Sequence, residues 1–134
     1  MSGVFKKDRK ETYYDPVDTA KKLQVKVLGY VMSEKYIPKR WIRMIGEPMV
    51  RKSDEIAFWA TAANETWLDN RHITERKMHW KKAEIACKQL DILIDKAVQV
   101  IPTVTPNSTE EVARLLSEET RLVTNKIKYE KVKK

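Results

Sequence analysis

Glycine, proline and cysteine are scarce in this chain, and long apolar runs are absent. The 134 residues include three glycines, five prolines and a single cysteine, Cys87. One thiol cannot form an intramolecular disulfide, and it cannot hold a metal ion without further ligands. No apolar run approaches the roughly 18 residues needed to cross a membrane, and residues 1–20 contain no signal-peptide core. We therefore expect a cytoplasmic protein without membrane contact.

Side chains that commonly carry catalysis are also few. His72 and His79 lie seven residues apart, and the Glu-x-x-His pairs of di-metal helical bundles do not occur. Cys87 lies within an apolar helical stripe, where a buried and unreactive thiol is expected. The glycines are isolated, so no phosphate-binding loop is formed. The sequence therefore predicts a protein that is not an enzyme and uses no metal, cofactor or small-molecule substrate.

Charged residues are abundant, in a composition that favours helices. They make up 34% of the chain, and apolar residues make up 42%, enough for the core of one domain of this length. The straight side chains of Lys and Glu lose little entropy in a helix, whereas glycine loses much. The composition therefore indicates one folded, mostly helical domain.

Apolar residues recur at spacings of three and four along four segments, which is typical of helices with one buried face. Asp15 and Pro16 suit a helix start, with the aspartate as N-cap. Ser108 and Glu111 match a capping box before the last segment. The predicted helices cover residues 16–34, 38–68, 75–101 and 109–128.

These segments predict an all-α fold, an antiparallel up-down-up-down four-helix bundle with short connections. Pro48 should kink the second helix, because it removes a backbone hydrogen bond. Residues 1–14 are basic and lack an apolar period, so we expect a flexible basic arm there. Residues 15–128 then form the bundle, and residues 129–134 form a basic tail.

The net charge of +8 is unevenly distributed, with cations gathered near the start of the second and third predicted helices. Trp41 and Trp80 lie among these cations, and cations interleaved with aromatic rings can hold phosphates and stack on bases. The alternative is that both tryptophans pack at helix ends while the cations are solvated. The candidate nucleic-acid or partner-binding residues are Lys35, Lys39, Arg40, Arg43, Arg51, Lys52, Arg76, Lys77, Lys81 and Lys82.

Several apolar residues fall outside the main stripes. Ile85 and Ile92 are seven residues apart on the third predicted helix, and Phe58 lies beyond the stripe of the second. A second apolar face predicts self-association. Trp59 and Trp67 are expected in the core or at a subunit interface.

Three segments carry a resemblance to a known family. They are Tyr36-Ile37-Pro38-Lys39-Arg40, the series from Lys82-Ala83 through Leu90-Asp91-Ile92-Leu93-Ile94, and the run from Glu110-Glu111-Val112 to Thr120-Arg121-Leu122. In this arrangement the chain resembles the four-helix-bundle family of the accessory variability protein (Avd) of diversity-generating retroelements and the 23S rRNA intervening-sequence proteins. The resemblance covers about residues 16–128.

The resemblance implies a specific function. Avd-like proteins are basic, non-catalytic bundles that form homopentamers and associate with a reverse transcriptase and its template RNA, which supports cDNA synthesis and mutagenic retrohoming. The matching cations are Lys39, Arg40, Arg43, Arg76, Lys77 and Lys81, with an implied role in contacting nucleic acid or the polymerase. Two alternatives remain open: a nucleic-acid-binding bundle with an unrelated partner, such as rRNA or a mobilisation complex, and a structural phage component.

Overall fold

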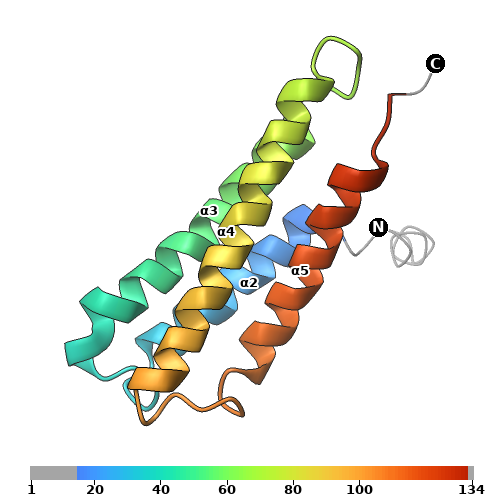
Figure 1. Ribbon diagram of the computed structural model, residues 1–134. Helices are drawn as coiled ribbons and strands as arrows, with labels where there is room; N and C mark the ends of the chain where they lie inside the picture. Colours follow the sequence, from blue (N-terminus) through green and yellow to red (C-terminus); the bar gives the residue numbers. More distant parts are fainter. Residues whose placement is uncertain (1–14, 133–134) are drawn as a thin grey trace, which may run out of the picture.

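The computed structural model describes residues 15–132, and within that range the chain is all-helical, without strands (Figure 1). The segments are α2 (Pro16–Met32), the 3₁₀ turn η1 (Lys39–Trp41), the π-helical turn η2 (Ile42–Gly46), α3 (Glu47–Glu65), α4 (Ile73–Val100) and α5 (Glu110–Tyr129). None of the described helices has the length and apolar character needed to cross a membrane. The arm predicted over residues 1–14, and residues 133–134 of the predicted tail, lie outside the described residues.

The four long helices pack around a shared core. α2 packs mainly against α3 and α5, and α4 packs against the same two helices, so α2 and α4 lie diagonally across the bundle. The connection between α3 and α4 lies at one end, which we call the hairpin end (Figure 1). The α2–α3 connection and the α4–α5 connection lie at the other end, which we call the η end. The predicted four-helix fold is therefore confirmed.

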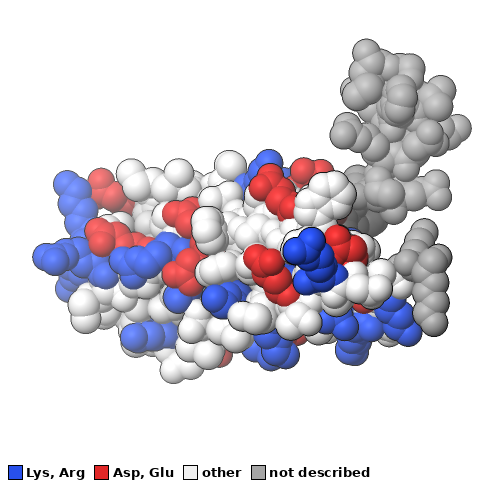
Figure 2. Space-filling view, turned by 90° about the horizontal axis from the view of Figure 1, so that it is seen from above, with Lys and Arg blue, Asp and Glu red and all other residues white. Residues whose placement is uncertain are grey.

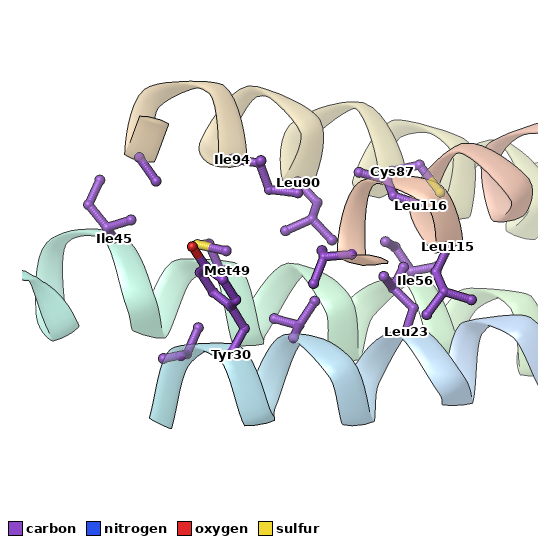
Figure 3. Close-up of a cluster of buried hydrophobic side chains, with 14 of the residues drawn as sticks. Leu23, Tyr30, Ile45, Met49, Ile56, Cys87, Leu90, Ile94, Leu115 and Leu116 are labelled. Atoms are coloured by element: carbon purple, nitrogen blue, oxygen red, sulfur yellow. The ribbon is translucent and has the colours of Figure 1, made fainter. Parts of the chain in front are cut away.

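Two clusters of buried apolar side chains hold the helices together. In the larger cluster, side chains from all four long helices and from η2 meet, and Cys87 lies among them (Figure 3). Cys87 is 1% exposed, and burial raises the pKa of its thiol to about 12, as expected for an inert thiol. In the smaller cluster Trp80 is fully buried against alanines of α3 and α4 and against Val123 of α5.

The helix predicted over residues 38–68 consists of three segments. The backbone passes from a 3₁₀ turn through a π-helical turn before α3 begins at Glu47. The N–H of Glu47 bonds to the carbonyl of Ile42, which closes the π-helical turn. Pro48 then stands in the first turn of α3, where the missing N–H removes no bond within that helix. The kink predicted near Pro48 stays a prediction.

Two of the local signals give different outcomes. Asp15 caps α2 as predicted, because its carboxylate accepts a hydrogen bond of 2.7 Å from the N–H of Val17. The capping box at Ser108 is wrong, since α5 begins after Thr109 without a side-chain cap. The hydroxyl of Ser108 lies instead 2.6 Å from the hydroxyl of Tyr30 and so joins the α4–α5 connection to α2.

The segment between α2 and α3 is anchored by close packing. Ile37 and Ile45 are buried in the larger cluster. Gly46 is also buried, and a Cβ atom built on it would lie only 2.8 Å from Cγ1 of Val31. Tyr36 stacks on a tyrosine of α2 with ring centroids 4.6 Å apart. These contacts hold η1 and η2 rigidly on the end of the bundle.

The two helical glycines should therefore respond oppositely to alanine. Gly46→Ala should lower the free energy of unfolding by about 1–3 kcal/mol, because the stiff Val31 side chain cannot yield without strain. Gly29→Ala should raise it by about 1 kcal/mol, since nothing lies near the added methyl group and alanine is the better helix former. Urea denaturation of both variants checks the pair. Equal effects of the two substitutions would contradict the packing described here.

A carboxyl group is buried on α5. Glu119 is 0% exposed, and within residues 15–132 neither of its oxygens has a hydrogen-bond partner. Burial raises the pKa of Glu119 to about 9, and the negative charges of Asp15 and Glu118 act in the same direction. The side chain is therefore protonated in the folded protein at neutral pH.

This carboxyl should make stability depend on pH. The unfolded chain releases the Glu119 proton near pH 4.5, whereas the folded chain keeps it to about pH 9, so stability is lost as the pH rises through this window. Glu119→Gln cannot ionise, and its melting temperature should increasingly exceed that of the parent towards pH 9. Thermal unfolding across this range tests it. Glu111→Gln, an exposed change on the same helix, is the control, and parallel profiles for Glu119→Gln and the parent would refute the assignment.

Candidate nucleic-acid interface

The predicted cations fall into two groups at opposite ends of the bundle. The η group consists of Lys35, Lys39, Arg40, Arg43, Arg51 and Lys52, and the α4 group consists of Arg76, Lys77, Lys81 and Lys82. The 19 residues of α3 separate the two ends, which corresponds to about 28 Å at the usual helical rise. The cations that the sequence places near the starts of the second and third predicted helices therefore do not form one joint surface.

The η group forms an exposed cationic surface. Lys35, Lys39, Arg40, Arg43 and Arg51 are all exposed, and within the described part of the chain none of them forms an ion pair. Lys52 is half-buried and binds Glu55 at 3.1 Å. Figure 2 shows lysine and arginine side chains gathered at the left of the view, where the end carrying the start of α3 lies. The surface can therefore bind a polyanion without first breaking internal salt bridges.

Trp41 supports this surface from beneath. The indole is half-buried and packs against the larger core cluster, and the guanidinium of Arg40 lies 5.8 Å from its ring centroid. Its Nε1 is buried without a hydrogen-bond partner among the described residues. The indole therefore packs against the core, as the packing alternative expects, while Arg40 beside it is exposed.

Arg76 does not belong to an exposed surface. It is 7% exposed, and its Nε and Nη2 each donate a hydrogen bond of 2.7 Å to the carboxylate of Glu130. A third bond runs from Nη1 to the carbonyl of Thr66. The Nε1 of Trp80 donates to the same carboxylate at 3.0 Å. Arg76 and Trp80 are thus structural, and the prediction that they line a binding surface is corrected.

This buried clamp ties α4 to the C-terminal end of α5 and to the residues after α3. Burial acts to raise the pKa of Glu130, but the hydrogen bonds and charge of Arg76 outweigh it and lower the pKa below its ordinary value. Glu130 therefore stays ionised, although the sequence placed it in a basic tail. A paired, hydrogen-bonded charge can be buried at moderate cost, whereas an unpaired one cannot.

Removing one member of the clamp should be costly. Arg76→Leu removes two hydrogen bonds from the buried Glu130 carboxylate, which keeps only Lys126 at 3.6 Å and the N–H of Trp80. The free energy of unfolding should fall by about 3 kcal/mol, the lower end of the range for a broken buried pair. Urea denaturation at neutral pH measures this loss. Arg114→Leu breaks an exposed pair with Glu111 and is the matched control, for which little change is expected. Similar losses in both variants would show that the Arg76–Glu130 pair contributes no more to the free energy of unfolding than an exposed ion pair does.

The exposed part of the α4 group is smaller than predicted. Lys81 is exposed but binds Glu84 at 3.2 Å, while Lys77 and Lys82 form no ion pair within residues 15–132. The Nζ of Lys82 lies 4.4 Å from the ring centroid of Trp59. Three lysines therefore remain at this end, and one of them rests on an aromatic ring.

Aromatic residues that the sequence analysis assigned to the core or to an interface accompany these lysines. Trp59 is half-buried. Its ring centroid lies 4.9 Å from that of Phe58 and 5.6 Å from that of His79. Phe58 is 63% exposed, and Trp67 is 75% exposed on the turn after α3. The off-stripe position of Phe58 signalled its exposure, but no sequence pattern placed Lys82 over Trp59.

The described residues offer binding surfaces but no metal centre. Within residues 15–132, no three His, Cys, Asp or Glu side chains gather where they could hold an ion. His72 lies 2.8 Å from Asp69, and His79 lies 3.2 Å from the hydroxyl of Thr66. Comparisons with models of known families, with curated proteins and with solved structures gave no match.

Proposed function

We propose that this chain is a non-catalytic accessory protein that binds RNA through the η group and the exposed lysines of the α4 group. The observation that carries the proposal is the set of five exposed cations that form no ion pair within residues 15–132. Four of them lie on the segment anchored by Ile37, Ile45 and Gly46, and Arg51 lies on α3. Cations on a fixed backbone lose little entropy on binding, and each phosphate they neutralise releases counterions.

The family resemblance supplies the finer proposal. It makes the RNA the template of a diversity-generating retroelement, with the reverse transcriptase as protein partner and mutagenic retrohoming as the outcome. A homopentamer belongs to the same proposal and is supported by exposed apolar residues on α2 (Val25, Met32) and on α4 (Ile85, Ile92). α2 and α4 lie diagonally across the bundle, so α2 of one copy can contact α4 of the next. Contacts of this kind between unlike surfaces can close a ring.

The alternative keeps the RNA-binding surface but changes the partner. A bundle that binds rRNA, a mobilisation complex or packaged phage nucleic acid would use the same exposed cations. Reconstitution separates these functions, because only the leading proposal expects co-purification with a reverse transcriptase and stimulation of its cDNA synthesis.

The charge contribution can be measured directly. Arg40→Gln with Arg43→Gln should weaken binding of a single-stranded RNA and reduce the slope of log affinity against log salt by about 1.4, since each lost phosphate contact contributes about 0.7. Fluorescence anisotropy between about 50 and 200 mM salt gives the slope. The control is Arg114→Gln with Arg121→Gln, which removes equal charge from glutamate-paired positions on α5.

Two outcomes would contradict the proposal. If the parent binds RNA through its overall charge alone, the control pair should lose as much slope as the η-group pair. That result would remove the η group from the interface. Absence of any salt-sensitive RNA binding by the parent protein would remove RNA as a ligand altogether.

A further inference from the structure

We propose that Trp59, with Phe58 and Lys82, forms a stacking site for one unpaired base of a bound RNA strand. This inference rests on the proposed RNA-binding function and deepens it, because it identifies single-stranded RNA as the ligand and the hairpin end as the place where a base is held. The indole of Trp59 has a fixed position, because it packs against the smaller core cluster.

Three contacts hold Trp59 in one orientation. One part of the ring packs against the smaller core cluster around Trp80. Phe58 meets the ring nearly perpendicularly, at 86° between planes, and His79 lies beside it at a tilt of 31°. The hydroxyl of Thr66 lies within hydrogen-bond distance of the His79 ring. A ring held in this way loses little freedom when a ligand stacks on it.

The ammonium of one lysine lies over the ring of Trp59. Lys82 is exposed, and its ammonium lies 4.4 Å from the ring centroid without a carboxylate partner among residues 15–132. An exposed cation–π contact of this kind is weak, and the flexible stem of the lysine lets the ammonium move aside. A base can therefore replace the ammonium on the indole, and the displaced ammonium can pair with the neighbouring phosphate.

The surrounding charge selects an anionic ligand. Lys77 and Lys81 lie on the same helix as Lys82, and the cation already on the indole disfavours a second cation such as an alkylammonium group. On the α2 side, Phe58 borders a groove whose charged lining residues are Asp54, Glu65 and Lys21, so acidic side chains outnumber basic ones there. The strand therefore approaches from the side of α4. A planar group next to an anion matches this arrangement, and a nucleotide supplies both.

The test compares two short RNA strands of equal length and charge. One is an oligoadenylate, and the other carries abasic riboses throughout, so it keeps the phosphates but offers nothing to stack. The parent protein should prefer the oligoadenylate by about ten-fold, in the range that one base–aromatic stack contributes. Trp59→Leu should remove that preference and leave the affinity for the abasic strand unchanged.

Three further variants keep the result interpretable. Phe58→Ala changes an exposed residue and should reduce the preference several-fold without unfolding the protein, should Trp59→Leu prove unstable. Val100→Ala removes an exposed apolar side chain at the opposite end of α4 and should keep the full preference. Lys82→Gln should weaken the binding of both strands, because it removes a phosphate contact.

Three results would overturn the stacking site. Equal affinity of the parent for the two strands, or full preference in Trp59→Leu, refutes stacking while leaving RNA binding by charge intact. Failure to bind either strand refutes the proposed function itself. An acidic peptide of alternating Glu and Tyr tests the other class of ligand. If it binds as tightly as oligoadenylate and loses affinity equally in Trp59→Leu, the site recognises acidic peptides and not RNA.

Discussion

Each long helix of this bundle can bury only one stripe of side chains, and that constraint decides where the charges lie. The stripes of all four long helices meet in the two core clusters, so the remaining faces, with most of the 27 cations, are left to solvent. The connection between α2 and α3 carries four of the six cations of the η group, because a short anchored segment there cannot bury its own polar side chains. The basic surface is thus a consequence of the packing and not an addition to it.

The few charges inside the bundle follow different rules. The Arg76–Glu130 pair is ionised because each partner supplies what the other loses on leaving water, and Trp80 adds a further donor. Glu119 has no hydrogen-bond partner among residues 15–132, and its burial, together with the charges of Asp15 and Glu118, favours the neutral form. The carboxyl of Glu130 is therefore ionised and that of Glu119 is protonated, although both belong to the same stretch of chain.

Periodicity was sufficient to find the four helices, because their apolar stripes are long and regular. It could not place side chains that depend on partners distant in sequence. Arg76 looked like a surface cation since its partner, Glu130, stands 54 residues away. Ser108 looked like a helix cap because nothing local reveals its bond to Tyr30. The two basic groups seemed continuous because sequence clustering says nothing about which end of a helix each group occupies.

The distance between the two basic groups sets a minimum ligand size. With phosphates spaced as along one strand of a duplex, roughly eight of them span the length of α3. A shorter oligonucleotide can occupy only one end of the molecule, whereas a longer one gains from high effective concentration at the second end. In the proposed complex, the length of α3 therefore sets the shortest strand that can contact both ends of the bundle.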